Sequence, residues 1–357
     1  MSSRKFKIGG NLLYNSVLIT LMLIILPFGK SYGQIDSQAE KIIQAVTSND
    51  CSKAFKLAKS LESPNMAESN NNTSLLMYGA NFGCNDFVKL LLEKGANVDF
   101  QDKSGFTALF YASQKGNVEI GTLLLLKGAN VDLQTHIGEN ALMAASNNGH
   151  IEMVKLLLVS NAKVDLQASN GFTSLMCASQ TGQIGIVKLL LDSNAKVDLQ
   201  AGNGYTALMY AGQKGNIEII KLLLAKAAKV DFQGIKDGVN VLMLASQNGY
   251  IEIVKLLLDK ETNVNLKSTE GLTPLYLAVQ NGYVEIAKLL LDKGADENLQ
   301  LRNGATALMV SSSMGNVDMV KLLLSRGANP NLKTKNGEIA FDFTDNKIIK
   351  DLLIHNK

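Results

Sequence analysis

The sequence predicts an all-α fold, a solenoid of helix-turn-helix units connected by short β-turn or hairpin loops. Two sets of glycines and a run of leucines each recur at a period of 33 residues. The segments between them have the apolar spacing of short helices. The chain of 357 residues is 46% hydrophobic, so it has ample apolar surface to bury between such units.

The first residues have the composition of an export signal that is removed. They begin with several basic residues, continue with an apolar run over residues 17–28, and end with the small residues Ser31 and Gly33 ahead of Gln34. A helix that spans a membrane needs about 20 apolar residues, whereas this run has about a dozen. We therefore expect a cleaved signal peptide over residues 1–33, with an uncleaved membrane tether as the alternative.

Removal of this signal changes the net charge of the chain. Residues 1–33 carry four of the 35 Lys and Arg residues and none of the 32 Asp and Glu residues, so the net charge falls from +3 to −1. A chain without net positive charge lacks the electrostatic field with which proteins hold nucleic acid. We therefore expect no nucleic-acid partner, and no membrane association once the signal has been cleaved.

The glycines define the repeating unit. Those of the first set, which we expect in turns, are Gly105, Gly138, Gly171, Gly204, Gly238, Gly271, Gly304 and Gly337. Those of the second set, which we expect at helix ends, are Gly83, Gly116, Gly149, Gly182, Gly215, Gly249, Gly282 and Gly315. Both sets contain one step of 34 residues, which places a single extra residue in the loop at residues 234–237.

Two helices are expected in each unit, for example over residues 107–112 and 118–126. Thr107 can cap the first of them with its hydroxyl group, and Gly116 suits the left-handed turn that ends it. The second helix carries the run of leucines. One helix pair is too small to bury that much leucine, so the units must stack on their neighbours.

These features resemble the ankyrin repeat, a turn followed by the motif T-P-L-H-x-A and two antiparallel helices at a period of about 33 residues. Residues 273–278, Thr-Pro-Leu-Tyr-Leu-Ala, are the closest copy, and other units read Thr-Ala-Leu-Met, as at residues 206–209. The motif's Pro and His are usually replaced, which removes a hydrogen bond that in the family ties the turn to the helix. The resemblance covers residues 64–328 as eight ankyrin repeats and implies a non-enzymatic module for protein–protein interaction.

The segments at the two ends of this array differ from the repeat. Residues 37–63 are expected to form an N-terminal helical cap, in which Ile42 and Val46 face inward. Residues 329–357 are expected to form a C-terminal capping repeat with a shortened helix pair. Polar caps keep the leucine surfaces at the ends of an array from associating, so we expect a monomer.

In ankyrin stacks, partners usually dock on the concave surface formed by the turn tips and the first helices, and the resemblance implies the same surface here. The residues predicted to contact a protein partner there are Phe106, Gln114, Lys115, Phe172, Gln180, Tyr205, Gln213, Lys214, Gln247 and Gln280. Rigid aromatic rings supply contact area and amides supply adaptable hydrogen bonds, as binding surfaces generally do. The alternative is that these positions are solvated and alike only because the repeats are copies.

The three cysteines raise the question of a disulfide. Cys51 and Cys84 are one period apart, and a bond between them would fasten the N-terminal end of the array in an oxidising compartment. Equivalent positions of neighbouring repeats are normally too far apart, since a disulfide requires Cα atoms within about 7 Å, but the divergent cap can bring them closer. The pairing stays open at this point. Cys177 is expected to be a buried free thiol.

No catalytic site, metal site or cofactor is expected. The histidines, His136, His150 and His355, form no motif with Cys, Ser or carboxylates, and no phosphate-binding loop is present. Five methionines occupy the position of the motif's His: Met143, Met176, Met209, Met243 and Met309. Stacked helices lie about 10 Å apart, too far for several sulfurs to bind one copper ion, so we expect these methionines to fill the core.

Charged residues also recur once in each unit. One aspartate per loop, as at Asp99 and Asp132, is too few for calcium, which needs about six to eight oxygen ligands, so we expect hydrogen bonding within the loops. Lysines of the second helices, such as Lys155 and Lys221, follow a glutamate by three residues. This spacing predicts a solvated face of internal ion pairs.

Together these features predict an exported interaction scaffold, periplasmic or secreted, whose partner is another protein. The abundance of Asn and Lys and the form of the signal indicate a bacterial origin. The alternative is a regulatory or accessory subunit that stabilises or inhibits an exported enzyme or a stress-response protein. A hydrolase or redox enzyme is not favoured, because the required constellations of polar residues are missing.

Overall fold

The computed structural model of the chain describes residues 37–260 and 262–356, and the predicted signal peptide lies outside these residues. Every regular element in the described part is a helix, and the only strand-like pairing there is an isolated bridge between Ala67 and Ser74. The prediction of an all-α solenoid is confirmed. No helix in the described part is long and apolar enough to cross a membrane.

The described residues fall into two compact units, which we call the N-terminal unit (residues 37–236) and the C-terminal unit (residues 237–356). The helices of the N-terminal unit are α1 (Ser37–Thr47), α2 (Cys51–Ala58), α3 (Leu75–Phe82), α4 (Asn85–Glu93), α5 (Ala108–Lys115), α6 (Val118–Leu126), α7 (Ala141–Asn148), α8 (Ile151–Val159), α9 (Ser174–Thr181), α10 (Ile184–Asp192), α11 (Ala207–Lys214) and α12 (Ile217–Ala225). Those of the C-terminal unit are α13 (Val241–Asn248), α14 (Ile251–Leu258), α15 (Pro274–Gln280), α16 (Val284–Asp292), α17 (Ala307–Ser313), α18 (Val317–Ser325), the 3-10 helix η1 (Ala340–Phe343) and α19 (Lys347–His355).

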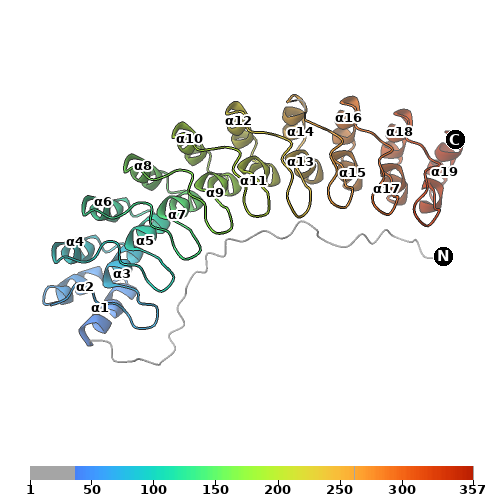
Figure 1. Cartoon of the computed structure of the whole chain (residues 1–357). Coiled ribbons are helices and arrows are strands. Elements are labelled where there is room, and N and C mark those ends of the chain that lie inside the picture. Colours follow the sequence, from blue (N-terminus) through green and yellow to red (C-terminus); the bar gives the residue numbers. More distant parts are fainter. Residues whose placement is uncertain (1–36, 261, 357) are drawn as a thin grey trace. The chain divides into compact units, whose positions relative to one another are not determined.

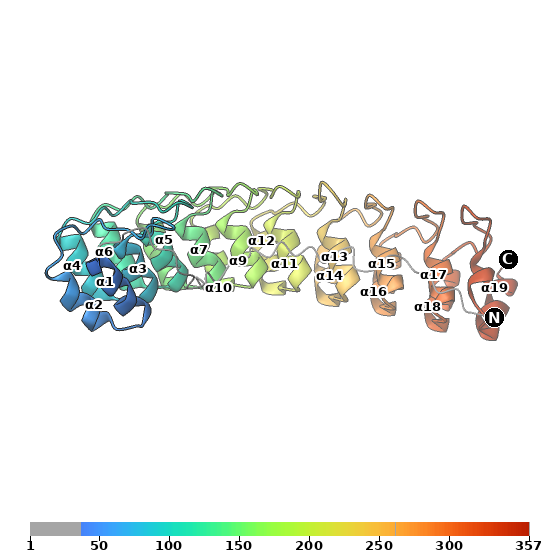
Figure 2. The same ribbon diagram turned by 90° about the horizontal axis from the view of Figure 1, so that it is seen from below.

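Within each unit the helices form two layers (Figure 1). In the N-terminal unit the first helices of successive pairs, α3 to α11, pack on one another in one layer, and the second helices, α4 to α12, pack in the other. The C-terminal unit repeats the arrangement with α13, α15 and α17 against α14, α16 and α18. Within each unit, considered by itself, the long loops between pairs extend beyond the first helices (Figures 1 and 2).

Each first helix has clear start and stop signals. Thr107 lies just before α5, and its hydroxyl accepts a hydrogen bond from the Phe110 N–H at 3.1 Å, as a helix cap does. The helix ends at Gly116, whose φ of 72° is left-handed. Both predictions for this helix are confirmed. The other first helices are capped in the same way, by Ser74, Asn140, Thr173, Thr206, Asn240, Thr273 and Thr306.

The repeated leucines form the core between the layers. In the N-terminal unit the middle leucines of three successive second helices, Leu124, Leu157 and Leu190, have no exposed surface. Full burial of one leucine side chain stabilises a fold by about 1.5–3 kcal/mol. The methionines at the motif's His position are also buried, with Met143 at 3% exposure and Met176 at 1%. They therefore fill the core, as expected.

Consecutive loops contact each other closely. The Ser169 N–H donates to the Ile137 carbonyl of the preceding loop at 2.8 Å, and equivalent bonds join the other loops within each unit. Gly138 has a φ of 79°, and a Cβ atom there would lie 2.8 Å from the Ser169 nitrogen. Only glycine therefore permits this approach. The loop aspartates contribute as expected, since Asp132 Oδ1 accepts a bond from the Lys163 N–H at 2.9 Å.

The terminal helices cover the ends of the array. In α1, Ile42 and Val46 have no exposed surface, in agreement with the inward orientation predicted for them. At the other end, η1 replaces a full first helix and packs on α17, while α19 packs on α18. The shortened pair predicted for the C-terminal segment thus consists of η1 and α19.

Candidate functional site

The surface that the sequence predicts to bind a protein partner lies where the first helices meet the long loops. We call it the first-helix face and define it by the exposed sides of the first helices, by the residue that follows each turn glycine, and by the last two residues of each first helix. The face occurs in both units, and each unit is considered separately. Two kinds of predicted contact residue, aromatic residues and amides, behave differently on it.

The aromatic residues after the turn glycines pack inward. Phe172 and Tyr205 are only 3% and 5% exposed. The Phe172 ring lies 4.9 Å from the Tyr210 ring of α11, and the Tyr205 ring lies 5.6 Å from the same ring. These two residues fill the space between loop and helix, which corrects the expectation that they form an exposed contact strip. Phe106 differs from them, because its side chain is half-buried and keeps some exposed surface.

Phe106 belongs to an aromatic cluster that the sequence reasoning missed. Its ring centre lies 4.7 Å from that of Phe110 and 5.6 Å from that of Tyr111. The Tyr111 hydroxyl donates to Asp102 Oδ2 at 3.3 Å. Burial, followed by the negative charge of Asp102, raises the pKa of Tyr111, so this hydroxyl stays protonated and is a hydrogen-bond donor near neutral pH.

Asp102 is a structural residue and not a binding carboxylate. It is 7% exposed, and its Oδ1 accepts hydrogen bonds from the backbone N–H groups of Ser104 at 2.8 Å and Phe106 at 2.9 Å. Together with the Tyr111 hydroxyl, these donors satisfy the carboxylate. Asp102 therefore fixes the loop that presents Phe106.

The predicted amides occupy one repeated position near the end of each first helix. Gln114, Gln180 and Gln213 are half-buried in the N-terminal unit, as are Gln247 and Gln280 in the C-terminal unit. None of these five side-chain amides makes a hydrogen bond within the part of the chain that the structure describes. Asn81 and Asn147 hold the same position on α3 and α7 and complete the row of amides in the N-terminal unit. Their contact with a partner stays a prediction.

Lys115 and Lys214 follow two of these glutamines and end α5 and α11. Both are exposed, and neither forms an ion pair with any described residue. They add positive charge to the first-helix face of the N-terminal unit. Their role in binding also stays a prediction.

Among the residues that follow the turn glycines of the N-terminal unit, Glu139 is the only one that is not aromatic. It stands where the neighbouring loops carry Phe106 and Phe172, and its side chain is half-buried. Its carboxylate makes no hydrogen bond or ion pair with the described residues, and burial raises its pKa. Burial, and after it the negative charge of Glu139, raises the pKa of the buried Cys177 thiol to about 12.

Comparison with known proteins identifies the repeated unit. A family model for ankyrin repeats, which describes three copies of the repeat, matches residues 42–135, 120–201, 196–268 and 242–334. The chain belongs to the ankyrin repeat family. Ankyrin repeats are generally non-enzymatic modules that bind other proteins. No curated protein matches this sequence.

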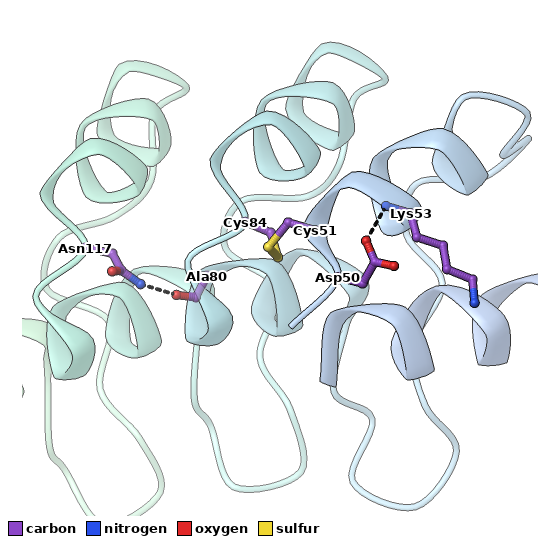
Figure 3. Close-up of a disulfide and its surroundings, with 6 residues drawn as sticks. All are labelled: Asp50, Cys51, Lys53, Ala80, Cys84 and Asn117. Carbon is purple, nitrogen blue, oxygen red and sulfur yellow. Dashed lines mark hydrogen bonds between the residues drawn. A yellow bond between two sulfur atoms is a disulfide. The ribbon is translucent and has the colours of Figure 1, made fainter. Parts of the chain in front are cut away.

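The first ankyrin repeat is covalently joined to its cap. Cys51, the first residue of α2, is bonded to Cys84, which precedes α4, with an S–S distance of 2.02 Å and a Cα–Cα distance of 5.2 Å (Figure 3). The sequence left this pairing open because repeat spacing is normally too wide. Helix α2 packs directly on α4, so the cap approaches more closely than the spacing of regular repeats suggested.

The other charged positions of the ankyrin stack have structural roles. Lys155, Lys221 and Lys255 pair with the glutamate three residues earlier at 2.7, 2.7 and 2.9 Å, so the predicted ion pairs form in these three repeats. All these side chains are largely exposed, and such pairs contribute little stability. Among the described residues, no group of three or more His, Cys, Asp or Glu side chains is arranged to hold a metal ion.

Proposed function

We propose that this ankyrin repeat protein is an exported, non-enzymatic scaffold that acts as a monomer and binds one protein partner on its first-helix face. The observation that carries the proposal is the row of half-buried amides on Gln114, Gln180 and Gln213, which find no hydrogen bond among the described residues. These amides keep some exposed surface and are not committed to the fold, so a bound protein that supplies donors and acceptors gains affinity there.

Other glutamines of the chain show that this row is selective. The loop glutamine Gln167 donates from Nε2 to the carbonyl of Gly171 at 2.8 Å and to that of Gln200 at 3.1 Å. Gln101 does the same toward Gly105 and Gln134, at 2.8 and 3.0 Å. The loop glutamines thus use their amides to hold consecutive loops together. The helix glutamines leave theirs available for recognition.

The proposed export rests on two observations. Residues 1–33 have the composition of a signal peptide. The bond between Cys51 and Cys84 is of a kind that persists in oxidising compartments and is rare in the cytosol. The periplasm or the exterior of a bacterial cell fits both. N-terminal sequencing of the protein from its host should find Gln34 as the first residue, and an intact Met1 on the cellular protein would contradict cleavage.

Crosslinking in the native host tests the binding face. A photo-reactive amino acid at position 114 or 213 should capture one protein, whereas the same amino acid at the exposed Lys188 of α10, on a second helix, should not. The captured protein is then identified by mass spectrometry and titrated calorimetrically against purified protein. The triple variant Gln114→Ala/Gln180→Ala/Gln213→Ala should bind it at least about tenfold more weakly, since each hydrogen bond contributes about 1 kcal/mol.

A matched control removes three exposed side chains from second helices, Lys89→Ala/Lys188→Ala/Lys288→Ala, and should leave affinity unchanged. Thermal unfolding of both triple variants checks that neither substitution disturbs the fold. Equal affinity of the glutamine variant and the unmodified protein would show that the partner binds elsewhere.

A further inference from the structure

We propose that the partner inserts a single cationic side chain, Lys or Arg, against Glu139 on the first-helix face of the N-terminal unit. The inference rests on the proposed function, because it assumes that a protein binds this face. It adds the chemistry by which the partner is recognised.

The register of the repeats gives Glu139 the position at which the Phe172 and Tyr205 rings pack in the next two repeats. Phe172 contacts Tyr210, the residue 38 positions further along the chain, with ring centres 4.9 Å apart. Glu139 and Cys177 have the same separation in sequence, and the charge of Glu139 acts on the Cys177 thiol. The register of the repeats therefore gives Glu139 the position that Phe172 holds one repeat later. A carboxylate in this position gives up the apolar packing that the ring provides one repeat later.

The first helices around Glu139 also carry smaller side chains than their neighbours. One repeated position is Tyr111 on α5 and Tyr210 on α11, but it is Ala144 on α7 and Cys177 on α9. Ala144 and Cys177 are 8% and 3% exposed. On the first-helix face, two successive repeats therefore carry a small side chain at this position, and the repeats on either side of them carry a tyrosine. The Glu139 carboxylate stands beside this stretch.

No cation of the described chain neutralises this carboxylate. Lys103, at the tip of the preceding loop, directs its Nζ at the carbonyl oxygens of Asn70, at 2.6 Å, and Ser69, at 3.3 Å. His136 lies in the same loop as Glu139, is exposed and makes no ion pair with it. Cys177 is a buried neutral thiol. An unpaired, half-buried carboxylate is unfavourable, and a cation from a partner removes that cost.

Aromatic surface in the neighbouring repeat suits the same cation. Phe106 and Tyr111 are half-buried, so both residues keep some exposed surface on the first-helix face. A cation that pairs with a carboxylate and also lies near the face of an aromatic ring gains affinity from both contacts. Lys115 and Lys214, on α5 and α11, make the flanks of the site positive and disfavour a polybasic segment. One cation between uncharged or acidic neighbours is the complementary pattern.

A display library of random 15-residue peptides, selected against the full chain, provides the probe. Selected peptides should contain a Lys or Arg at one fixed position. Each such peptide is resynthesised with citrulline, the neutral analogue of arginine, at that position. Both versions are titrated against the unmodified protein, against Glu139→Gln, and against Glu139→Phe, which installs the residue of the neighbouring repeats.

We expect the arginine peptide to lose about tenfold in affinity when either the arginine or Glu139 is neutralised. Removal of both charges should cost no more than removal of one, because they act as a pair. Glu139→Phe should be stably folded and equally weak for the arginine peptide. Equal binding of the arginine and citrulline peptides to the unmodified protein would overturn the inference, as would unchanged binding of the arginine peptide to Glu139→Gln.

The amide variant Gln114→Ala/Gln180→Ala/Gln213→Ala separates this inference from the proposed function. One outcome is that the selected peptides bind the amide variant more weakly and yet bind equally well with arginine or citrulline. That outcome would support the proposed function and reject the pairing of a cation with Glu139. Charge coupling without an effect of the amide variant would retain the cation and reject the role of the amides. A selection that yields no peptide sensitive to either change would reject both.

Discussion

Asn117 donates from its side-chain Nδ2 to the Ala80 carbonyl of the preceding repeat at 2.8 Å, at the repeat position that Cys51 and Cys84 occupy further toward the N-terminus (Figure 3). Two later repeats use the same position in the same way. The His150 ring bonds the Gln114 carbonyl at 3.0 Å, and Asn216 bonds the Ser179 carbonyl at 3.1 Å. One position thus ties the first repeat to its cap covalently and ties three later repeats to the one before by hydrogen bonds.

Loss of the disulfide should loosen the cap. Closing a loop of this length stabilises a protein by about 3 to 4 kcal/mol, and the effect of Cys51→Ala/Cys84→Ala should concentrate on α1 and α2, because each repeat contacts only its neighbours. Hydrogen exchange of α1 and α2 measures it. Reductant should reproduce the change in the unmodified protein and have no effect on the double variant. Unchanged protection of α1 after reduction would contradict a stabilising role.

Asn117→Ala should lower the free energy of unfolding by about 1 kcal/mol, because the Ala80 carbonyl loses its side-chain donor. Urea denaturation gives the value. Asn148→Ala is the matched control, since the Asn148 amide bonds only the Ala144 carbonyl of its own helix and is exposed. If both variants lose the same free energy of unfolding, the hydrogen bond between repeats contributes no more than a bond within one helix.

Two glycines separate backbone strain from contact between loops. Gly138 and Gly95 both have left-handed φ angles, 79° and 86°, but a Cβ at Gly95 meets nothing within 4 Å. Alanine at either position costs about 1 kcal/mol for the backbone. Gly138→Ala should cost clearly more, because its Cβ would lie 2.8 Å from the Ser169 nitrogen. The difference between the denaturation midpoints of the two variants measures the cost of the contact between loops. Equal midpoints would show that this contact has no cost.

Neutralising Glu139 should stabilise the free protein in a pH-dependent way. Burial raises the pKa of Glu139 above its ordinary value of 4.5, so the folded state holds this proton more tightly than the unfolded state. The stability gained from binding this proton is complete at pH values below the ordinary pKa. It is lost as the pH rises through the higher pKa of the folded state. Glu139→Gln does not titrate, so its stability relative to the unmodified protein should rise between acidic and neutral pH. Denaturation at several pH values measures this, with the exposed Glu62→Gln as control.

Cys177 should be unreactive in the folded protein. It is 3% exposed, and burial raises its pKa to about 12, so very little thiolate is present near neutral pH. Iodoacetamide at neutral pH should label it much more slowly in native than in denatured protein, as followed by mass spectrometry. Rapid labelling of the native protein would show that α9 opens readily.

The parts of the fold that depend on one residue could be predicted from the sequence. A glycine with left-handed φ and a hydroxyl that caps a helix act locally, so Gly116 and Thr107 indicated their helix ends directly. The same holds for the buried leucines and methionines, whose period reports the stacking.

The site could be predicted only in part, because it depends on the distance between repeats. Whether Phe172 points outward or onto Tyr210 is decided by how closely the next repeat packs, and no pattern in one repeat states that distance. The same distance decides whether Cys51 reaches Cys84. The replacement of an aromatic residue by Glu139 was visible in the sequence, but its lack of a partner within the described chain required the surrounding side chains.

The bond between Cys51 and Cys84 needs only the first four helices. A polypeptide whose N-terminus emerges first can therefore close this bond before its later repeats are complete. The next helix pair can then pack on the apolar surface of the pair before it. The covalently closed end can therefore serve as the point from which the stacking of the later repeats begins.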